Sequence, residues 1–237
     1  MIFITGDTHG DQRRLGSALT AMRSYSAAEK YLIVCGDFGF LFSSQESEQE
    51  ERFLDDLAHL HDEGIFFLFI DGNHENHRRL NDLPVETWNG GRVHFLRSNV
   101  IHLMRGEVFQ LEGRTFFTFG GAVSTDQLYR REHFFHTGEL IWWPEEQPTL
   151  DDYAHGRETF SCLDRVDYVL SHTAPAFAQQ EMCLPAFWEE RPLNLYLDEV
   201  RRTLDFSHWF FGHYHLDETC QVAGRPFTCV YRDVIPL

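Results

Sequence analysis

The apolar residues of the chain occur either in short continuous runs or at helical spacing, and the alternation of these two patterns predicts the order of strands and helices. Short apolar runs at 2–5, 31–35 and 65–70 predict buried strands. Between them, residues 11–23 and 44–63 carry apolar side chains at helical spacing, and Gly64 follows as an expected C-cap. Strands that alternate with helices in this way predict parallel pairing through right-handed crossovers.

The pattern changes in the middle of the chain. Residues 93–98, 100–104, 107–113 and 114–121 are strand-like runs separated by turn residues, which predicts hairpins. Residues 124–150 follow neither pattern and are expected to be irregular. The expected order then continues with a helix near 150–163, a strand at 166–170, a proline-containing loop, a helix near 193–204 and strands at 208–211, 216–222 and 226–231. Because no repeat or linker is evident, residues 1–237 are expected to form a single α/β domain.

Composition narrows the classes of function. Hydrophobic residues make up 43% of the chain, enough for a sizeable core, while the net charge of −17 argues against stable nucleic-acid binding. No apolar stretch approaches the length of a membrane span, and the N-terminus lacks the features of a signal peptide. The five cysteines include no C-x-x-C pair. We therefore expect a cytoplasmic protein with reduced thiols and no membrane partner, and its oligomeric state stays open.

Ligand-type side chains follow five of the expected strands. They occur in Gly6-Asp7-Thr8-His9, Gly36-Asp37, Asp71-Gly72-Asn73-His74-Glu75, Ser171-His172-Thr173 and Gly212-His213-Tyr214-His215. The carboxyl ends of parallel strands meet at one edge of a sheet, so these side chains are expected to converge. Each has a plainer explanation when taken singly, because Asp and Asn cap helices and Gly forms turns. It is the joint pattern that indicates a functional site.

The chemistry of this set favours metal binding. Imidazole, carboxylate and amide donors without thiolate suit two divalent ions such as manganese, iron or zinc. The candidate ligands are Asp7, His9, Asp37, Asn73, His172, His213 and His215. Two neighbouring ions need a shared anion, and Asp37, alone after its strand, is expected to bridge them.

In order and spacing, these residues resemble the calcineurin-like metallophosphoesterase superfamily, whose motifs read D-x-H, G-D, G-N-H-[DE], H and G-H-x-H. The resemblance implies two facing mixed β-sheets flanked by helices, a four-layer sandwich. It also implies two metal sites that share Asp37, with manganese as the first expectation and iron or zinc open. One would use Asp7, His9, Asp37 and His215, and the other Asp37, Asn73, His172 and His213.

The resemblance further implies a hydrolase that acts on a phosphate monoester or diester of a small molecule, such as a nucleotide. A metal-bridging hydroxide would attack phosphorus in line with the leaving group. His74 would then protonate the leaving oxygen, because imidazole is the side chain suited to donate a proton near neutral pH. Gly72 is expected to allow the sharp turn that separates Asn73 from His74.

The chain departs from one branch of the superfamily. Its second motif continues as GDFGFLF, without the Asp and Arg that protein serine/threonine phosphatases carry there. A protein-phosphatase or diadenosine-tetraphosphatase activity is therefore not favoured, and His74 has no expected partner. Candidate substrate contacts are Arg78, Arg130 and Arg131, and Trp142 and Trp143 are either a substrate wall or packing residues.

Two other functions have weaker support, and the second of them is rejected unless its condition is met. A non-catalytic scaffold of the same fold would bind partner proteins, but such a protein is expected to lack some of the ligands that this chain keeps. The run HYHLDE nearly matches the H-x-H-x-D-H run of metallo-β-lactamase-like hydrolases. That interpretation requires Asp217 to be a metal ligand.

Overall fold

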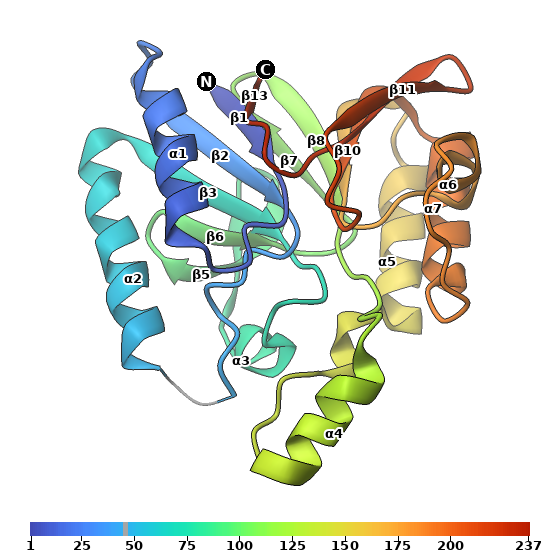
Figure 1. Cartoon of the computed structure of the whole chain (residues 1–237). Coiled ribbons are helices and arrows are strands. Elements are labelled where there is room, and N and C mark those ends of the chain that lie inside the picture. Colours follow the sequence, from blue (N-terminus) through green and yellow to red (C-terminus); the bar gives the residue numbers. More distant parts are fainter. Residues whose placement is uncertain (45–46) are drawn as a thin grey trace.

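Two mixed β-sheets pack face to face in the computed structural model, which describes residues 1–44 and 47–237 (Figure 1). One sheet runs, in spatial order, through β13 (Ile235–Pro236), β1 (Ile2–Thr5), β2 (Lys30–Cys35), β3 (Ile65–Ile70), β6 (Val100–Leu103), β5 (Gly91–Arg97) and β4 (Val85–Trp88). The other runs through β11 (Glu218–Val222), β12 (Arg225–Cys229), β10 (Asp205–Phe211), β9 (Arg165–Ser171), β8 (Arg114–Phe119) and β7 (Glu107–Leu111). The expected pair of facing mixed sheets is confirmed.

The central strands of each sheet run parallel. In the first sheet β1, β2, β3 and β6 pair in parallel, and in the second β8, β9, β10 and β12 do so. The antiparallel pairings lie toward the edges, and they include the expected hairpins β5–β6 and β7–β8. The polar motifs follow β1, β2, β3, β9 and β10, so they leave the parallel strands at their carboxyl ends.

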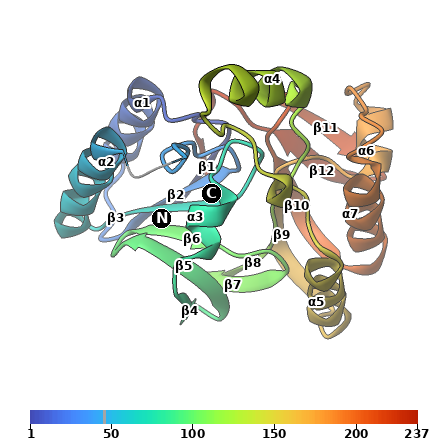
Figure 2. The same cartoon turned by 90° about the horizontal axis from the view of Figure 1, so that it is seen from below.

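Helices form the two outer layers (Figure 2). The first half of the chain contributes α1 (Gln12–Arg23), α2 (Glu48–His59), the 3₁₀ turn η1 (Leu60–Glu63) and α3 (His77–Asn81). The second half contributes α4 (Gln127–Thr137), the 3₁₀ turn η2 (Pro144–Glu146), α5 (Leu150–Ser161), α6 (Ala176–Glu181) and α7 (Arg191–Thr203). Seen from below, α1 and α2 lie outside the first sheet, and α5, α6 and α7 lie outside the second.

Three apolar layers hold the sandwich together. Ile4, Leu68, Phe116 and Phe210 belong to the cluster between the two sheets. A second cluster joins α1 and α2 to the outer face of the first sheet, and a third joins α5, α6 and α7 to the second sheet. Both faces of the parallel strands are therefore covered. This coverage explains why these strands read as continuous apolar runs rather than alternating ones.

Three sequence expectations need correction. Residues 124–150 are not irregular throughout, because α4 lies within them; Leu128 and Phe135 on this helix are 79% and 84% exposed, so it has no apolar stripe to reveal it. The helix expected over 44–63 begins at Glu48 and turns into 3₁₀ geometry at Leu60, while residues 45–46 of that expectation lie outside the described residues. The proline-containing loop holds α6. The expected C-cap is confirmed, with Gly64 at φ 69°.

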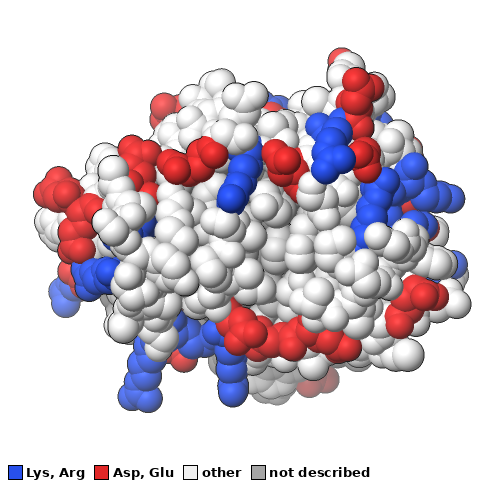
Figure 3. All heavy atoms as spheres, turned by 90° about the horizontal axis from the view of Figure 1, so that it is seen from above, with Lys and Arg blue, Asp and Glu red and all other residues white. Residues whose placement is uncertain are grey.

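The molecular surface bears on the excluded partners. Among the described residues, no helix combines the length and apolar character that crossing a membrane requires. Figure 3 shows the end of the sandwich away from α4, where basic and acidic side chains both occur around the rim and the middle is uncharged. That face therefore presents no continuous basic surface of the kind that nucleic-acid binding uses.

Candidate metal centre

Side chains that are far apart in sequence converge around Asp37. Its Oδ1 atom lies 3.3 Å from Nε2 of His172, and its Oδ2 atom lies 3.8 Å from Nε2 of His9. Asp7, His9 and His215 offer donor atoms that all lie within 4.8 Å of one another, and Asp7, Asp37 and His172 do the same. The structure thus brings the predicted ligands of β1, β2, β9 and the loop after β10 to one place.

The backbone conformation singles out the same residues. Positive φ is uncommon for residues other than glycine, and it concentrates at functional sites because the surrounding structure must hold it. Five of the nine non-glycine residues with positive φ in the described chain are candidate ligands: Asp7, His9, Asp37, His213 and His215. The loops after β1, β2 and β10 therefore adopt a costly conformation where the donors are presented.

Gly72 is needed for close approach and not for a left-handed turn. A Cβ atom on Gly72 would lie 2.2 Å from Oδ1 of Asp37 and 2.7 Å from Nε2 of His172, and its φ is outside the left-handed region. The expected bend in the chain is present at residues 73–75, and Gly72 contributes close approach rather than a left-handed conformation. The missing side chain lets the loop after β3 lie directly against the central carboxylate.

Several atoms that can ligate a metal ion are buried at this centre without a hydrogen bond of normal geometry. Oδ1 of Asn73 has no hydrogen-bond partner, whereas Nε2 of His172 and Nε2 of His213 lie 3.3 Å from carboxylate oxygens of Asp37 and Glu190 as ion-pair neighbours only. His172 donates its Nδ1–H to the carbonyl of Cys35 at 2.7 Å, which fixes the ring and turns Nε2 toward Asp37. Buried polar atoms are normally satisfied, and amide oxygen and imidazole nitrogen are donors that divalent cations accept. The residues present fit a pair of divalent ions.

Electrostatics at the centre favour a bound cation. Burial, opposed by His172 and assisted by the neighbouring Asp37 carboxylate, raises the pKa of Asp7 to about 7. Burial opposes ionisation of Asp37 as well, but His172, His74 and His9 outweigh it and hold the pKa of Asp37 well below its usual range. Burial would also lower the pKa of His172, yet Asp37 raises it to about 10. A divalent ion would take the place of that proton, because metal binding requires deprotonated ligands.

His9 and His215 point at each other. Their Nε2 atoms lie 2.8 Å apart, and the His215 ring stacks on Tyr231 with 4.5 Å between ring centroids. Burial lowers the pKa of His9 to about 4 and also lowers the pKa of His215. Both rings are therefore neutral near pH 7, which is the form of imidazole that binds a metal ion.

His74 lines a cavity of about 380 Å³ at this centre, together with Asp37, Asn73 and Arg130. Its backbone N–H donates to Oδ1 of Asp37 at 2.8 Å. Its Nε2 atom accepts a hydrogen bond from Nη2 of Arg130 at 2.9 Å, since a guanidinium group has only donors. Arg130 is buried in α4, and its Nε donates to Asp126 at 2.7 Å. Arg130 is therefore a hydrogen-bond donor to His74 and does not replace the carboxylate that the second motif lacks; burial, and to a smaller extent the Arg130 charge, lowers the pKa of His74.

The other two candidate arginines lie elsewhere. Arg78 is exposed, and its Nε atom lies 3.3 Å from Glu145. The Arg131 guanidinium lies 4.4 Å above the Trp142 ring and lines a neighbouring cavity. Of the three predicted substrate contacts, only Arg130 lines the cavity in front of His74.

Trp143 and Asp217 have structural contacts. Trp143 is buried against Phe42, with 5.4 Å between ring centroids, so it packs and does not form a substrate wall. Asp217 accepts backbone N–H groups from residues 231–233. It belongs to none of the metal-binding groups found among the described residues, which speaks against the metallo-β-lactamase-like interpretation.

Two further glutamates hold the ligand loops, and one of them had no sequence signal. Glu75 is buried and accepts the backbone N–H groups of Gly72 at 2.6 Å and Gly39 at 3.2 Å. Glu190 accepts the Thr173 hydroxyl at 2.6 Å, and its Oε1 lies 3.3 Å from Nε2 of His213. Glu75 is part of the third motif, whereas Glu190 lies outside all five motifs.

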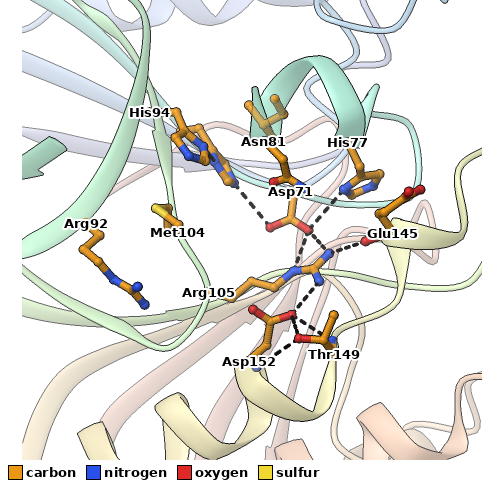
Figure 4. Close-up of a pocket in the computed structure, with 12 residues that line it drawn as sticks. Asp71, His77, Asn81, Arg92, His94, Met104, Arg105, Glu145, Thr149 and Asp152 are labelled. Atoms are coloured by element: carbon orange, nitrogen blue, oxygen red, sulfur yellow. Dashed lines mark hydrogen bonds and ion pairs between the residues drawn. The ribbon is translucent and has the colours of Figure 1, made fainter. Parts of the chain in front are cut away.

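Figure 4 shows a second charged cluster, which lies around Asp71 and Arg105. Asp71 accepts a hydrogen bond from Nε of Arg105 at 2.9 Å and lies 3.3 Å from Nε2 of His102. The Nδ1 atoms of His102 and His94 lie 3.1 Å apart. Arg105 and the histidines come from β5, β6 and the turn after β6, where no motif marked them. The cluster fixes the start of the loop, because Asp71 immediately follows β3.

Three solved structures are similar to this chain along nearly its whole length. The structure of TT1561 from Thermus thermophilus matches with a TM-score of 0.53 and 10% identity, over 98% of this chain and 89% of that one. The phosphopantetheinyl hydrolase of Mycobacterium tuberculosis matches with a TM-score of 0.45 and 19% identity, over 97% and 89% of the two chains. A putative 5'-nucleotidase from Staphylococcus aureus matches with a TM-score of 0.44 and 15% identity, over 98% and 48%.

These comparisons differ in what they establish. The likeness to TT1561 concerns the fold alone, since the identity is 10%. A search of curated proteins finds no match. The sequence profile described as calcineurin-like phosphoesterase, in contrast, matches residues 1–217. The chain therefore belongs to the calcineurin-like phosphoesterase family.

Proposed function

We propose that the protein is a metal-dependent phosphoesterase that hydrolyses a monoester or diester of a small phosphorylated molecule. It would act as one domain with two divalent ions, manganese being the first candidate. The first ion would be held by Asp7, His9, Asp37 and His215, and the second by Asp37, Asn73, His172 and His213. The observation that carries the proposal is the set of buried metal-ligand atoms around the buried Asp37 carboxylate, among them Oδ1 of Asn73, which has no hydrogen-bond partner, and Nε2 of His172.

The chain's own residues suggest how the leaving group departs. Divalent ions bound here would neutralise phosphoryl charge and lower the pKa of a bound water. A phosphoryl oxygen is a stronger acceptor for Arg130 than a neutral imidazole is, so Arg130 would turn from His74 to the phosphate. Nε2 of His74 would then be free to hold a proton for the leaving oxygen.

Two features bear on the cellular compartment and on the class of substrate. None of the five cysteines forms a disulfide, which agrees with a reducing compartment, and we propose the cytoplasm. The net charge of −17 disfavours polyanionic substrates such as nucleic acids.

The test is a substrate panel on protein loaded with manganese and analysed for metal content. Phosphomonoesters, cyclic nucleotides, dinucleotides and short DNA are assayed in parallel. We expect two manganese ions per chain, hydrolysis of at least one small ester and little hydrolysis of DNA. Two bound ions with no hydrolysis of any ester would favour the non-catalytic scaffold instead.

A further inference from the structure

A second cavity of about 380 Å³ lies beside the metal centre, between the start of α4 and the loop that precedes α7. Leu128, Arg131 and Glu189 line it, and it shares Thr125 and Phe187 with the cavity in front of His74. We call it the side groove. Because the two cavities meet at Thr125 and Phe187, a molecule bound at the metal centre can extend into the side groove.

The side groove exposes apolar surface in an unusual place. Leu128 is 79% exposed and Phe187 is half-buried, although both face a cavity next to a polar centre. Trp188, the residue after Phe187, is 80% exposed. Leu128 and Phe187 line the same cavity, and exposed apolar side chains grouped beside a functional site are typical of a surface that a ligand covers.

The charged side chains at the side groove balance one another. Glu189 and Arg131 line the groove itself, and Asp126 in the neighbouring cavity is paired with Arg130 at 2.7 Å. Arg131, the one cation among the described residues that line the groove, lies 4.4 Å above the Trp142 ring. A leaving group with further phosphate groups would find no excess of positive charge in the groove, whereas an uncharged chain can lie against Leu128 and Phe187.

We propose that the side groove binds the leaving group of the phosphoester and that this group is an extended apolar chain without further phosphates. The inference rests on the proposed function. The phosphate would lie near Asp37 and Arg130, and the leaving oxygen would lie beside His74. The carbon chain would then pass Phe187 and cover Leu128.

The test measures binding with alkylphosphonates, whose C–P bond is not a substrate for ester hydrolysis. Octylphosphonate and ethylphosphonate are titrated calorimetrically into manganese-loaded protein. A fully buried methylene strengthens binding about fourfold, so partial burial of the longer chain predicts at least about tenfold tighter binding of octylphosphonate. Leu128→Ser should reduce this preference to below about threefold. The matched control is Phe135→Ser, which changes an 84% exposed residue of α4 outside both cavities and should keep the preference.

Two results would overturn the inference: equal affinity for the two phosphonates, or the same preference in Leu128→Ser as in wild type. Hydrolysis of ethyl and octyl phosphate is followed separately by phosphate release. Hydrolysis with equal phosphonate affinities refutes the side groove and leaves the proposed function standing. A clear octyl preference without hydrolysis of either ester refutes the assignment of the occupant as a leaving group, and the proposed function falls with it only if no ester of the substrate panel is hydrolysed.

Discussion

The ion pair between Arg105 and Asp71 is expected to stabilise the loop that carries Asn73 and His74. Arg105 and Asp71 are 11% and 2% exposed, and burial works against the Arg105 charge while Asp71 raises the pKa of Arg105 above its usual value. Arg105→Met removes every N–H donor of the side chain and leaves an unbranched apolar side chain in its place. Asp71 would then remain buried, with His102 at 3.3 Å as its nearest remaining partner. Removing one partner of a buried ion pair typically costs about 3–5 kcal/mol.

This free energy translates into a measurable change in melting temperature. An unfolding entropy of about 2.1 cal/mol/K per residue gives roughly 0.5 kcal/mol/K for a chain of this length. Arg105→Met should therefore lower Tm by about 6–10 °C in differential scanning calorimetry. EDTA is present throughout, so that changes in metal binding do not contribute to the shift.

A surface pair provides the matched control. Arg157 pairs with Glu199, and these side chains are 48% and 36% exposed, so Arg157→Met should change Tm by no more than about 2 °C. The double variant Asp71→Asn/Arg105→Met should recover part of the loss, because no uncompensated charge remains buried. A Tm for Arg105→Met within about 2 °C of wild type would refute the reasoning. It would mean that the other groups around Asp71 stabilise its carboxylate without Arg105.

Three further predictions concern the site and its surroundings. Asp37→Ala should lower the manganese content of dialysed protein from two ions per chain to below one, and retention of both ions would contradict the bridging role. His74→Asn should slow turnover about 10²–10⁴-fold with unchanged metal content, and an unaltered kcat would exclude the acid role. Burial lowers the pKa of His94 from 6.5 to about 4. As the pH falls, the His94 side chain therefore becomes protonated in the unfolded chain before it does so in the folded protein. The stability that neutral His94 contributes is complete above pH 6.5 and is lost toward pH 4. With partial solvent screening taken into account, the free energy of unfolding of the wild type should fall by about 1–2 kcal/mol more than that of His94→Gln between about pH 7 and pH 4.5. Urea unfolding in the presence of EDTA measures this difference, and equal decreases in the two proteins would contradict the assignment to His94.

Much of the fold follows from local pattern. The apolar runs at β1, β2 and β3 were predicted to within a residue, because strands covered on both faces are apolar throughout. The rule that parallel strands present their carboxyl ends together then predicted that Asp7, Asp37 and His172 would converge, and they do. Their binding of metal ions remains a prediction. Residue type and position after a strand are both local properties of the sequence. For this reason the sequence alone was sufficient to predict which side chains lie together.

The contacts that complete the site belong to tertiary structure. Arg130 and His74 are 56 residues apart, and Arg105 and Asp71 are 34 apart, in segments where no periodicity indicates a contact. The helix that carries Arg130 leaves its large apolar side chains in water, so its sequence resembled an irregular segment. The sequence by itself determined which residues end the strands and therefore which donors meet. Only the packing of α4 and of the turn after β6 against the strand ends decided that Arg130 contacts His74 and that Arg105 contacts Asp71. Such contacts depend on how secondary-structure elements pack against one another and not on the sequence pattern within each element.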